Sequence, residues 1–335
     1  MEPTTLGDGT TLRLLGAEEG ALLGDAIRAA YGDSYDADWV YDAGEVGRRI
    51  AIGLLVSCVA EAADGSLLGH AGLSRHTPDE TVAEAGQAVT LPAARGHHLF
   101  TAIKGHLAGW ARKHGLFGLF SEATTAHPFS QRANVDLGAH ETGFLLGWIP
   151  DSVANDAAAD RTGRKSAALF YLKTNDGHDR PVYAPDRHRD VVAGIIEVTG
   201  LRGRVAEAPT GLRPPPTSAL HTEVRDDHNL AVLTVERPGS DLAAMVGRAR
   251  AELFDRGLDA VYVDLPLEQP ETEAAGEQLE ELGVTFAGIF PNARVDGDVL
   301  RLQCLHQVTV QADDIATGSD HGQELLAYVL ADLAT

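Results

Sequence analysis

The same order of strand and helix patterns occurs twice along the 335-residue chain, and this internal repeat constrains the fold more than any other feature. In the first half, a hairpin pattern turning at Asp64-Gly65 precedes a strand, a helix, a buried strand, a second helix and a final strand pair. In the second half the same order begins again with a hairpin pattern over 221–239. Two unrelated halves would not share so long an order by chance, so we predict a tandem repeat.

Glycines end the corresponding helices of the two units. The first helix of each unit has apolar residues three to four positions apart and ends at a glycine, Gly115 or Gly257. Its apolar positions are Leu99, Ile103, Leu107 and Trp110 in the first unit and Leu242, Met245, Ala249 and Leu253 in the second. The second helix ends in Leu-Gly in both units, at 137–138 and 282–283. These matching ends support the predicted repeat.

The length of the chain is sufficient for two domains with cores of their own. We predict an α/β protein of the α+β kind, with one domain over 1–175 and a second over 176–335. Each is expected to be a mostly antiparallel mixed sheet flanked by helices. An opening strand and helix over 10–32 correspond to a similar pattern over 180–201. A proline-rich stretch over 207–218 is predicted to be a linker.

Composition excludes several classes of partner. The formal net charge is −22, and nucleic-acid binding requires a positive face, so DNA, RNA and anionic membranes are not expected as partners. No apolar run approaches the roughly 18 residues of a membrane span, and the N-terminal residues lack a signal-peptide pattern, so we expect a cytoplasmic protein. Arginine supplies almost all basic side chains, which we assign to codon usage and not to function. The lysines are Lys104, Lys113, Lys165 and Lys173.

Other chemical motifs are absent from the sequence. It contains neither His-Glu-x-x-His nor Cys-x-x-Cys, so we predict no metal. Cys58 and Cys304 lie in apolar strand-like runs and are predicted to be buried structural thiols. Ser319, Asp320 and His321 are neighbours in a polar stretch, which we interpret as a turn because triad members come from distant segments.

Residues 91–100 carry the clearest functional pattern. A strand end, Pro92, Arg95-Gly96 and the first turn of a helix follow one another here. The N-terminus of a helix presents unsatisfied N–H groups and a partial positive charge to an anion. No Gly-Lys-Ser/Thr follows, so the loop is not a nucleotide-binding P-loop. The segment therefore predicts an anion site of another kind.

This loop, with the helix, strand, Leu-Gly helix and strand pair that follow it, resembles the GNAT superfamily of acyl-CoA-dependent N-acyltransferases. The resemblance implies a sheet that splits between its fourth and fifth strands, with the pantetheine arm of acetyl-CoA in the split. It also implies that a loop of pattern Gln/Arg-x-x-Gly-x-Gly/Ala wraps the pyrophosphate. Here Ala93, Gly96 and His98 occupy those three positions. A histidine where glycine or alanine is usual crowds the approach of the backbone to phosphate.

The resemblance thus implies acetyl-CoA as co-substrate, bound by the fourth strand, the loop and the two helices. The residues implied are Val89, Thr90, Leu91, Arg95, Gly96, His97, His98, Leu99, Ser130 and Gln131. A backbone N–H within 89–91 is expected to polarise the thioester oxygen. His97 or His98 can donate a hydrogen bond to a phosphate oxygen.

Direct transfer to an amine also needs groups that move protons. The acceptor arrives as an ammonium, and Glu84 is our first candidate for its base, with Glu122 across the split as the second. For both carboxylates a solvated or ion-paired role stays open. Asn134 stands where many family members carry the tyrosine that protonates the leaving thiolate, so the usual acid is missing. His127 or a water is expected to replace it, with Ser130 a weaker candidate.

The second unit lacks the loop pattern. Asp241 begins its first helix, where a carboxylate would cap the helix and repel a pyrophosphate. We predict a degenerate GNAT-like domain with a structural role or a role in closing the acceptor pocket. The whole chain is predicted to be an N-acetyltransferase acting on an amine or hydrazine group of a small molecule in a ternary complex. A non-catalytic acyl-CoA-binding or regulatory module stays open, as do the acceptor and assembly into a homo-oligomer.

Overall fold

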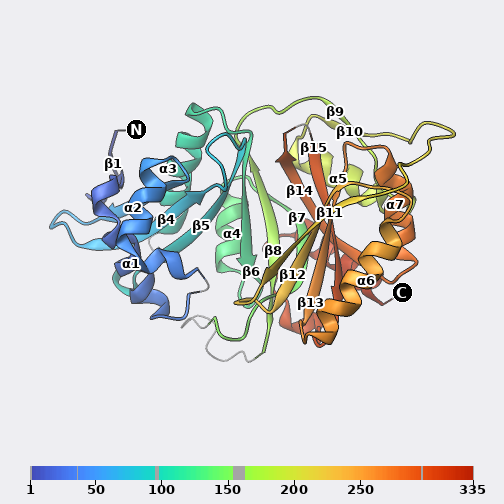
Figure 1. Cartoon of the computed structure of the whole chain (residues 1–335). Coiled ribbons are helices and arrows are strands. Elements are labelled where there is room, and N and C mark those ends of the chain that lie inside the picture. The colour runs from blue at the N-terminus through green and yellow to red at the C-terminus, as the bar shows by residue number, and fades with distance from the viewer. Residues whose placement is uncertain (1, 36, 95–97, 154–162, 296, 335) are drawn as a thin grey trace.

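A computed structural model describes residues 2–35, 37–94, 98–153, 163–295 and 297–334 of the chain (Figure 1). The first half contains β1 (Thr4–Thr5), β2 (Thr11–Leu14), β3 (Leu55–Glu61), β4 (Leu67–Ser74), β5 (Val82–Thr90), β6 (Gly118–Thr124), β7 (His140–Ile149) and β8 (Lys165–Lys173). Its helices are α1 (Ala21–Tyr31), α2 (Ala43–Ala51), α3 (Leu99–Lys113) and α4 (Phe129–Asp136).

The second half repeats the order hairpin, helix, strand, helix and strand pair. Its strands are β9 (Arg180–Val182), β10 (Gly203–Val205), β11 (Ala219–Arg225), β12 (Leu230–Arg237), β13 (Ala260–Pro266), β14 (Thr285–Arg294) and β15 (Gly297–Leu305). Its helices are α5 (Arg189–Thr199), α6 (Leu242–Asp255), α7 (Glu271–Glu280) and α8 (Asp320–Leu333). The predicted α/β fold class is confirmed, and the hairpin turn with Gly65 at φ 83° lies where the sequence predicts it.

Strand pairing shows which positions of the two halves correspond. The thirteen strands of the main sheet follow the order β1-β2-β3-β4-β5-β6-β8-β7-β14-β15-β13-β12-β11. β6 begins with Gly118 opposite Lys173 of β8, and β13 begins with Ala260 opposite Leu305 of β15. From its middle the sheet therefore runs β7-β8-β6 in one direction and β14-β15-β13 in the other, as two copies related by an approximate two-fold axis.

The two copies meet at a pair of glycines. Gly143 of β7 lies opposite Gly288 of β14, and each strand has a register shift beside its glycine. A Cβ on Gly288 would lie 2.5 Å from the Cα of Gly143 and 2.7 Å from the carbonyl oxygen of Thr142. Only residues without side chains allow this approach, so the glycines make the sheet continuous across the repeat.

We expect Gly288→Ala to lower the free energy of unfolding by about 1 to 3 kcal/mol, because the strands must separate to admit the methyl group. Gly194→Ala is the matched control. Gly194 lies within α5, and a Cβ there would meet nothing within 4 Å, so alanine should stabilise by up to about 1 kcal/mol. Denaturant titration of both variants measures the difference, and equal stabilities would show that the junction tolerates a side chain.

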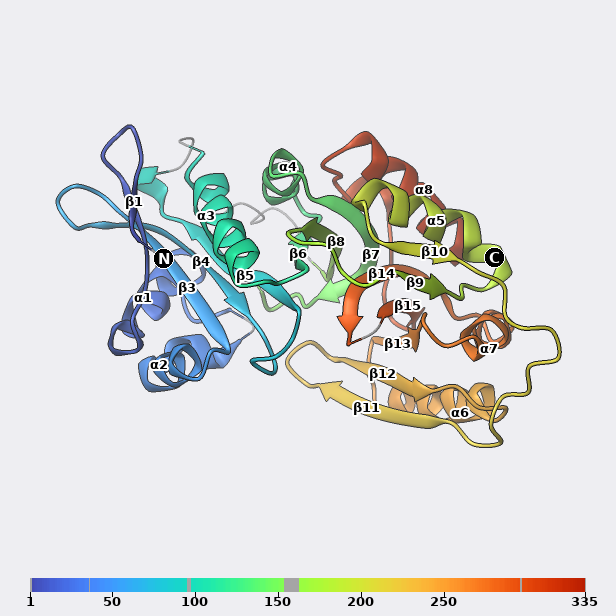
Figure 2. The ribbon, with the colours of Figure 1, turned by 90° about the horizontal axis from the view of Figure 1, so that it is seen from above.

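Helices cover the two faces of the sheet unequally. α3, α4, α5 and α8 lie along one side, and α1 and α2 lie on the opposite side of the first half (Figure 2). α3 packs on alternate residues of the strands, among them Ala83 and Ala85 of β5 and Leu119 of β6. The intervening residues face the other side, where Phe120 joins an aromatic cluster with β7 and β14. We call the α3 side the helical face and the opposite side the cleft face.

Four details differ from the sequence interpretation. β9 pairs with β10 in a separate two-stranded sheet and does not extend the main sheet as β2 does. α2 and α8 were not predicted. Ser319 does not belong to a simple turn. It is the N-cap residue of α8, and its Oγ accepts from Gly322 N. Asp241 does not cap α6 with its side chain, because Oδ1 accepts from the N–H and Oγ of Ser218 instead.

Candidate active site

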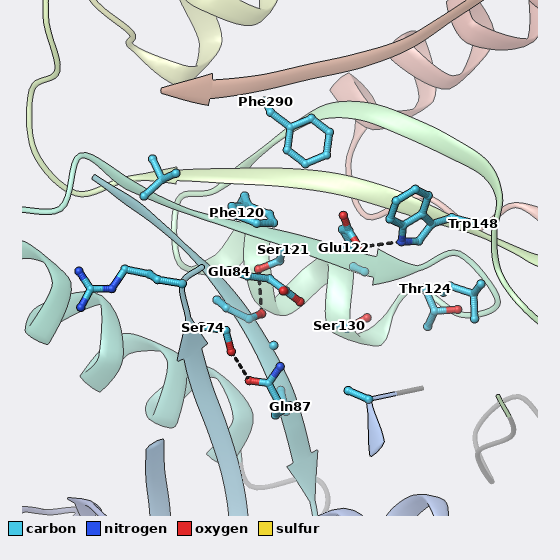
Figure 3. Close-up of a pocket in the computed structure, with 18 of the residues that line it drawn as sticks. Ser74, Glu84, Gln87, Phe120, Ser121, Glu122, Thr124, Ser130, Trp148 and Phe290 are labelled. Atoms are coloured by element: carbon cyan, nitrogen blue, oxygen red, sulfur yellow. Dashed lines mark hydrogen bonds between the residues drawn. The ribbon is translucent and has the colours of Figure 1, made fainter. Parts of the chain in front are cut away.

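A cleft of about 2480 Å³ opens on the cleft face between the two halves. Residues of β5 and β6 line one part of it (Figure 3). Residues of β11, β12 and β14 line another part. Pockets for single small ligands usually measure about 300 to 1000 Å³, so this cleft has room for more than one.

The split predicted between the fourth and fifth strands lies between β5 and β6. These strands pair only over Val82–Glu84 and Gly118–Phe120 and then diverge, and we call the resulting gap the wedge. In the second half, β12 and β13 stay paired over five positions, from Leu230 with Ala260 to Thr234 with Asp264. The opening is therefore wider in the first half.

A β-bulge shapes β5 at the wedge. Gln87 and Ala88 together lie opposite Ala71 of β4, and Gln87 has a φ of 46°. His70 contacts this bulge through Nδ1, 2.8 Å from the carbonyl oxygen of Gln87, and Ser57 Oγ lies 2.5 Å from its Nε2. Burial lowers the pKa of His70 to about 4, so a neutral ring holds the bulge.

Backbone geometry narrows the predicted donors over 89–91 to one. Leu91 N donates to Leu68 O at 2.9 Å, so this N–H bonds to β4. Antiparallel pairs alternate, so Val89 also faces β4, while the N–H of Thr90 is directed toward β6. Thr90 therefore presents the donor of β5 to the wedge.

The predicted cofactor residues have different surroundings. Thr90 Oγ1 and Ser130 Oγ are shielded from solvent without a hydrogen-bond partner in the described part of the chain. This is expected of groups that form hydrogen bonds with a bound ligand. His98 begins α3 with φ 54°, a conformation that glycine adopts without strain, and its side chain is exposed. Leu99 packs in the core. Arg95, Gly96 and His97 lie outside the described residues.

Gln131 is a buried residue of α4. Its Nε2 donates to Thr124 O at 3.2 Å and to Ala316 O at 2.8 Å, and these bonds join α4 to other parts of the chain. The side chain does not line the cleft, while Oε1 has no hydrogen-bond partner in the described part of the chain. Its role in cofactor binding stays a prediction.

Glu122 lies deep in the cleft on β6. Trp148 Nε1 donates to its Oε2 at 2.7 Å, while no hydrogen bond to Oε1 occurs among the described residues (Figure 3). Burial raises the pKa of Glu122 above the usual carboxyl range, although the positive charges of Arg301 and Arg225 oppose this effect. A carboxylate with a raised pKa is a stronger base than an ordinary carboxylate.

The second half has a carboxylate at the corresponding position, but it is neutralised. Asp264 of β13 lies opposite Arg301 of β15, whose Nε and Nη2 donate to the two carboxylate oxygens at 2.7 Å each. Glu122 instead lies opposite Leu169. The repeat therefore keeps an acidic residue in both halves and leaves only Glu122 without a direct arginine partner.

Glu84 and His127 line the same cleft. Glu84 is on β5, at the last pair before the strands diverge, so it lies at the narrow end of the wedge (Figure 3). His127 precedes α4, and its ring centroid lies 5.1 Å from that of Phe129. The structure therefore brings the three predicted catalytic residues to one cleft without testing their roles.

Lys104 is a polar residue of the site that sequence reasoning missed. It projects from the core side of α3, with Nζ donating to Ser121 Oγ at 2.9 Å and to Asn134 Oδ1 at 2.5 Å. The signal in the sequence is a lysine directly after Ile103 on an apolar helix face.

Other observations concern cysteines, metals and membranes. Cys58 and Cys304 are buried free thiols, as predicted, and burial raises their pKa values to about 12 and about 11. Within the described ranges, no three histidine, cysteine or acidic side chains cluster as metal ligands. No helix in those ranges is long and apolar enough to cross a membrane.

Comparisons with known proteins identify similar solved structures. No protein-family model and no curated protein matches the sequence. The similar structures are GNAT superfamily acetyltransferases. One is spermidine N-acetyltransferase from Vibrio cholerae in complex with CoA and spermine, at 14% identity and TM-score 0.39, covering 49% of this chain and 95% of that one.

Two other solved structures also cover about half of this chain. Ribosomal-protein-S5-alanine acetyltransferase from Vibrio fischeri has 10% identity and TM-score 0.42, covering 52% and 98% of the two chains. Phosphinothricin acetyltransferase from Sinorhizobium meliloti, in complex with AcCoA, has 18% identity and TM-score 0.40, covering 50% and 90%. Each of the three covers about half of this chain.

Proposed function

We propose that the chain is an acyl-CoA-dependent N-acetyltransferase whose active site belongs to residues 1–175. The observation that carries this proposal is the wedge between β5 and β6, with Glu84 at its narrow end and Glu122 on its cleft face. Thr90 and Ser130 supply shielded hydroxyl groups without partners in the described chain, which fits a polar ligand there. Residues 176–335 form a degenerate domain, because β12 and β13 diverge less than β5 and β6 do. This domain closes the cleft.

The residues divide the reaction between them. The Thr90 N–H is placed to polarise the thioester oxygen. Glu122 takes a proton from the acceptor ammonium, directly or through water, so that the nitrogen lone pair can attack the acyl carbon. Glu84 is the other candidate for this base. The thioester supplies the acyl group, and no metal is needed for direct attack.

We propose a small-molecule amine as acceptor. Glu84 and Glu122 of the first half line the cleft, while Glu223 and Glu268 of the second half are paired there with Arg225 and Arg294. A cationic amine would be favoured by these charges. The relative crystallised with spermine is an example of such chemistry in another protein. A cytoplasmic location and a homo-oligomer stay predictions.

Calorimetric titration with acetyl-CoA tests the cofactor site. We expect one site per chain, and we expect His98→Asp to lower the affinity by at least about tenfold, because a carboxylate at the start of α3 repels the pyrophosphate. The same residue can cap the helix, so the fold should persist. Asp241→His is the matched control, since Asp241 precedes α6 as His98 precedes α3.

Each result of this titration decides one point. Unchanged binding by His98→Asp would contradict the site at α3. Loss of binding by Asp241→His would place the site in the second half. Binding of acetyl-CoA without transfer to any amine of a broad screen would favour the non-catalytic module, which the asparagine at position 134 also suggested.

A further inference from the structure

The cluster of Lys104, Ser121 and Asn134 is a buried polar group beside the wedge. Lys104 is 6% exposed, and Nζ donates to two neutral oxygens, Ser121 Oγ and Asn134 Oδ1. Ser121 in turn donates to Ala85 O of β5 at 3.3 Å, so the cluster bridges the two diverging strands. A buried ammonium whose hydrogen bonds go to neutral groups is costly, because burial removes its hydration without supplying a counter-charge in contact.

The repeat shows that the fold does not require this cluster. The two halves can be aligned by the first residues of β6 and β13 and by the glycines that end their helices. In this alignment Lys104, Ser121 and Asn134 correspond to Val246, Val263 and Leu279. All three are fully buried in one apolar cluster. The same architecture therefore packs with three hydrocarbon side chains. The polar cluster occurs in the first half, where the wedge is open.

The sheet separates this cluster from the two carboxylates. Ser121 alternates with Phe120 and Glu122 along β6, so it faces α3 while they face the cleft. Because β5 and β6 are not paired beyond Glu84 and Phe120, a ligand in the wedge reaches both faces. The base for the amine and the cluster with Lys104 lie on opposite sides of such a ligand.

We propose that Lys104 donates the proton that the departing thiolate needs, in the place of the tyrosine that Asn134 replaces. This inference rests on the proposed acetyltransferase function. The amine nitrogen forms a bond to the acyl carbon, the carbon–sulfur bond breaks with its electron pair on sulfur, and sulfur takes a proton from Nζ. Lys104 is left neutral and regains a proton from solvent, which balances the one that Glu122 removed from the amine.

The groups around Lys104 suit this role. Burial lowers its pKa to about 7, and the charge of Glu84 on β5 opposes that shift. From β6 and α4 it faces the neutral Ser121 and Asn134, and from its own helix the ring of Phe100 at 5.4 Å. An ammonium in such surroundings gives up a proton more readily than a solvated lysine does.

Titration of the thiol of CoA bound to the whole protein tests the proposal without knowledge of the acceptor. The ultraviolet absorbance of the thiolate is followed against pH, with desulfo-CoA as the blank. Because an ammonium and a thiolate in contact stabilise each other, the thiol pKa should be at least about one unit lower in the wild type than in Lys104→Met. Lys113→Met is the matched control, since Lys113 is an exposed lysine of the same helix.

A second variant keeps the test valid if Lys104→Met misfolds. The triple variant Lys104→Val, Ser121→Val and Asn134→Leu copies the packing of the second half. It should fold and bind desulfo-CoA while losing the shift of the thiol pKa. Equal thiol pKa values in the wild type and both variants would overturn the role of Lys104 while CoA binding still supported the proposed function. Absence of CoA binding by the wild type would overturn both.

Discussion

Replacing Glu122 with glutamine should lower kcat/KM for amine acetylation by about 10²- to 10⁴-fold, the usual contribution of a general base. Glutamine keeps an oxygen that can accept from Trp148 Nε1, so the hydrogen bond that now joins these side chains at 2.7 Å can persist. The loss would therefore report the missing basicity and not a displaced indole. Initial rates with the best amine of a screen measure it.

The pH dependence should follow the raised pKa of Glu122. Only the carboxylate accepts a proton, so the wild-type rate should rise with pH through a pKa above the usual carboxyl range, and the rise should vanish in Glu122→Gln. The effect on stability has the opposite sign. A folded-state pKa above the unfolded value means that stability is lost as pH rises through that window, so Glu122→Gln should be more stable than the wild type at neutral pH.

Glu84→Gln is the comparison that assigns the base. If Glu122 is the base, this variant keeps the rise of rate with pH, because Glu84 influences the site only by its charge. If the rise disappears in Glu84→Gln and persists in Glu122→Gln, Glu84 accepts the proton. A rate unchanged in both variants would contradict carboxylate catalysis in the cleft.

Local patterns in the sequence predicted the elements of this fold well. The hairpin at Asp64-Gly65 and the helix ends at Gly138 and Gly283 follow from turn and capping preferences of neighbouring residues, and all three occur. The repeat of these signals predicted the common order of both halves. What joins the halves depends on Gly143 and Gly288, which are far apart in sequence, so no local pattern indicated one continuous sheet.

The site was predicted less completely because its chemistry depends on strand register. Only the observed strand pairing shows that Arg301 neutralises Asp264 while Glu122 lies opposite Leu169. Lys104 was missed for a related reason. Helical spacing placed it beside the apolar stripe of α3, and its contact with Asn134 connects two helices that no periodicity relates.

The largest loss of stability is expected from Asp298→Ala in the second half. Arg180 and Asp298 are 4% and 2% exposed, and the guanidinium donates through Nε and Nη2 to both carboxylate oxygens. Removing the carboxylate leaves a buried charge without its partner, which costs about 3 to 5 kcal/mol of unfolding free energy. Denaturant titration measures the change.

This ion pair also connects the two halves. Asp298 accepts from the N–H of Asn292 at 2.7 Å, and Asn292 Nδ2 donates to Tyr171 of β8 at 2.7 Å. Loss of the carboxylate should therefore weaken the link between β14 and the first half as well as the attachment of β9. We expect the denaturant midpoint to fall for the whole chain and not for one half alone.

Two further variants separate the charge from the shape. Arg180→Met combined with Asp298→Leu removes both charges and should recover most of the stability, since apolar groups of similar volume replace buried pairs well. Arg204→Met breaks an ion pair with Asp179 in which both side chains are exposed, and it should change stability by less than about 1 kcal/mol. If the double variant is as unstable as Asp298→Ala, the loss comes from the hydrogen bond to Asn292 and the network it supports, and the uncompensated charge of Arg180 is not its cause.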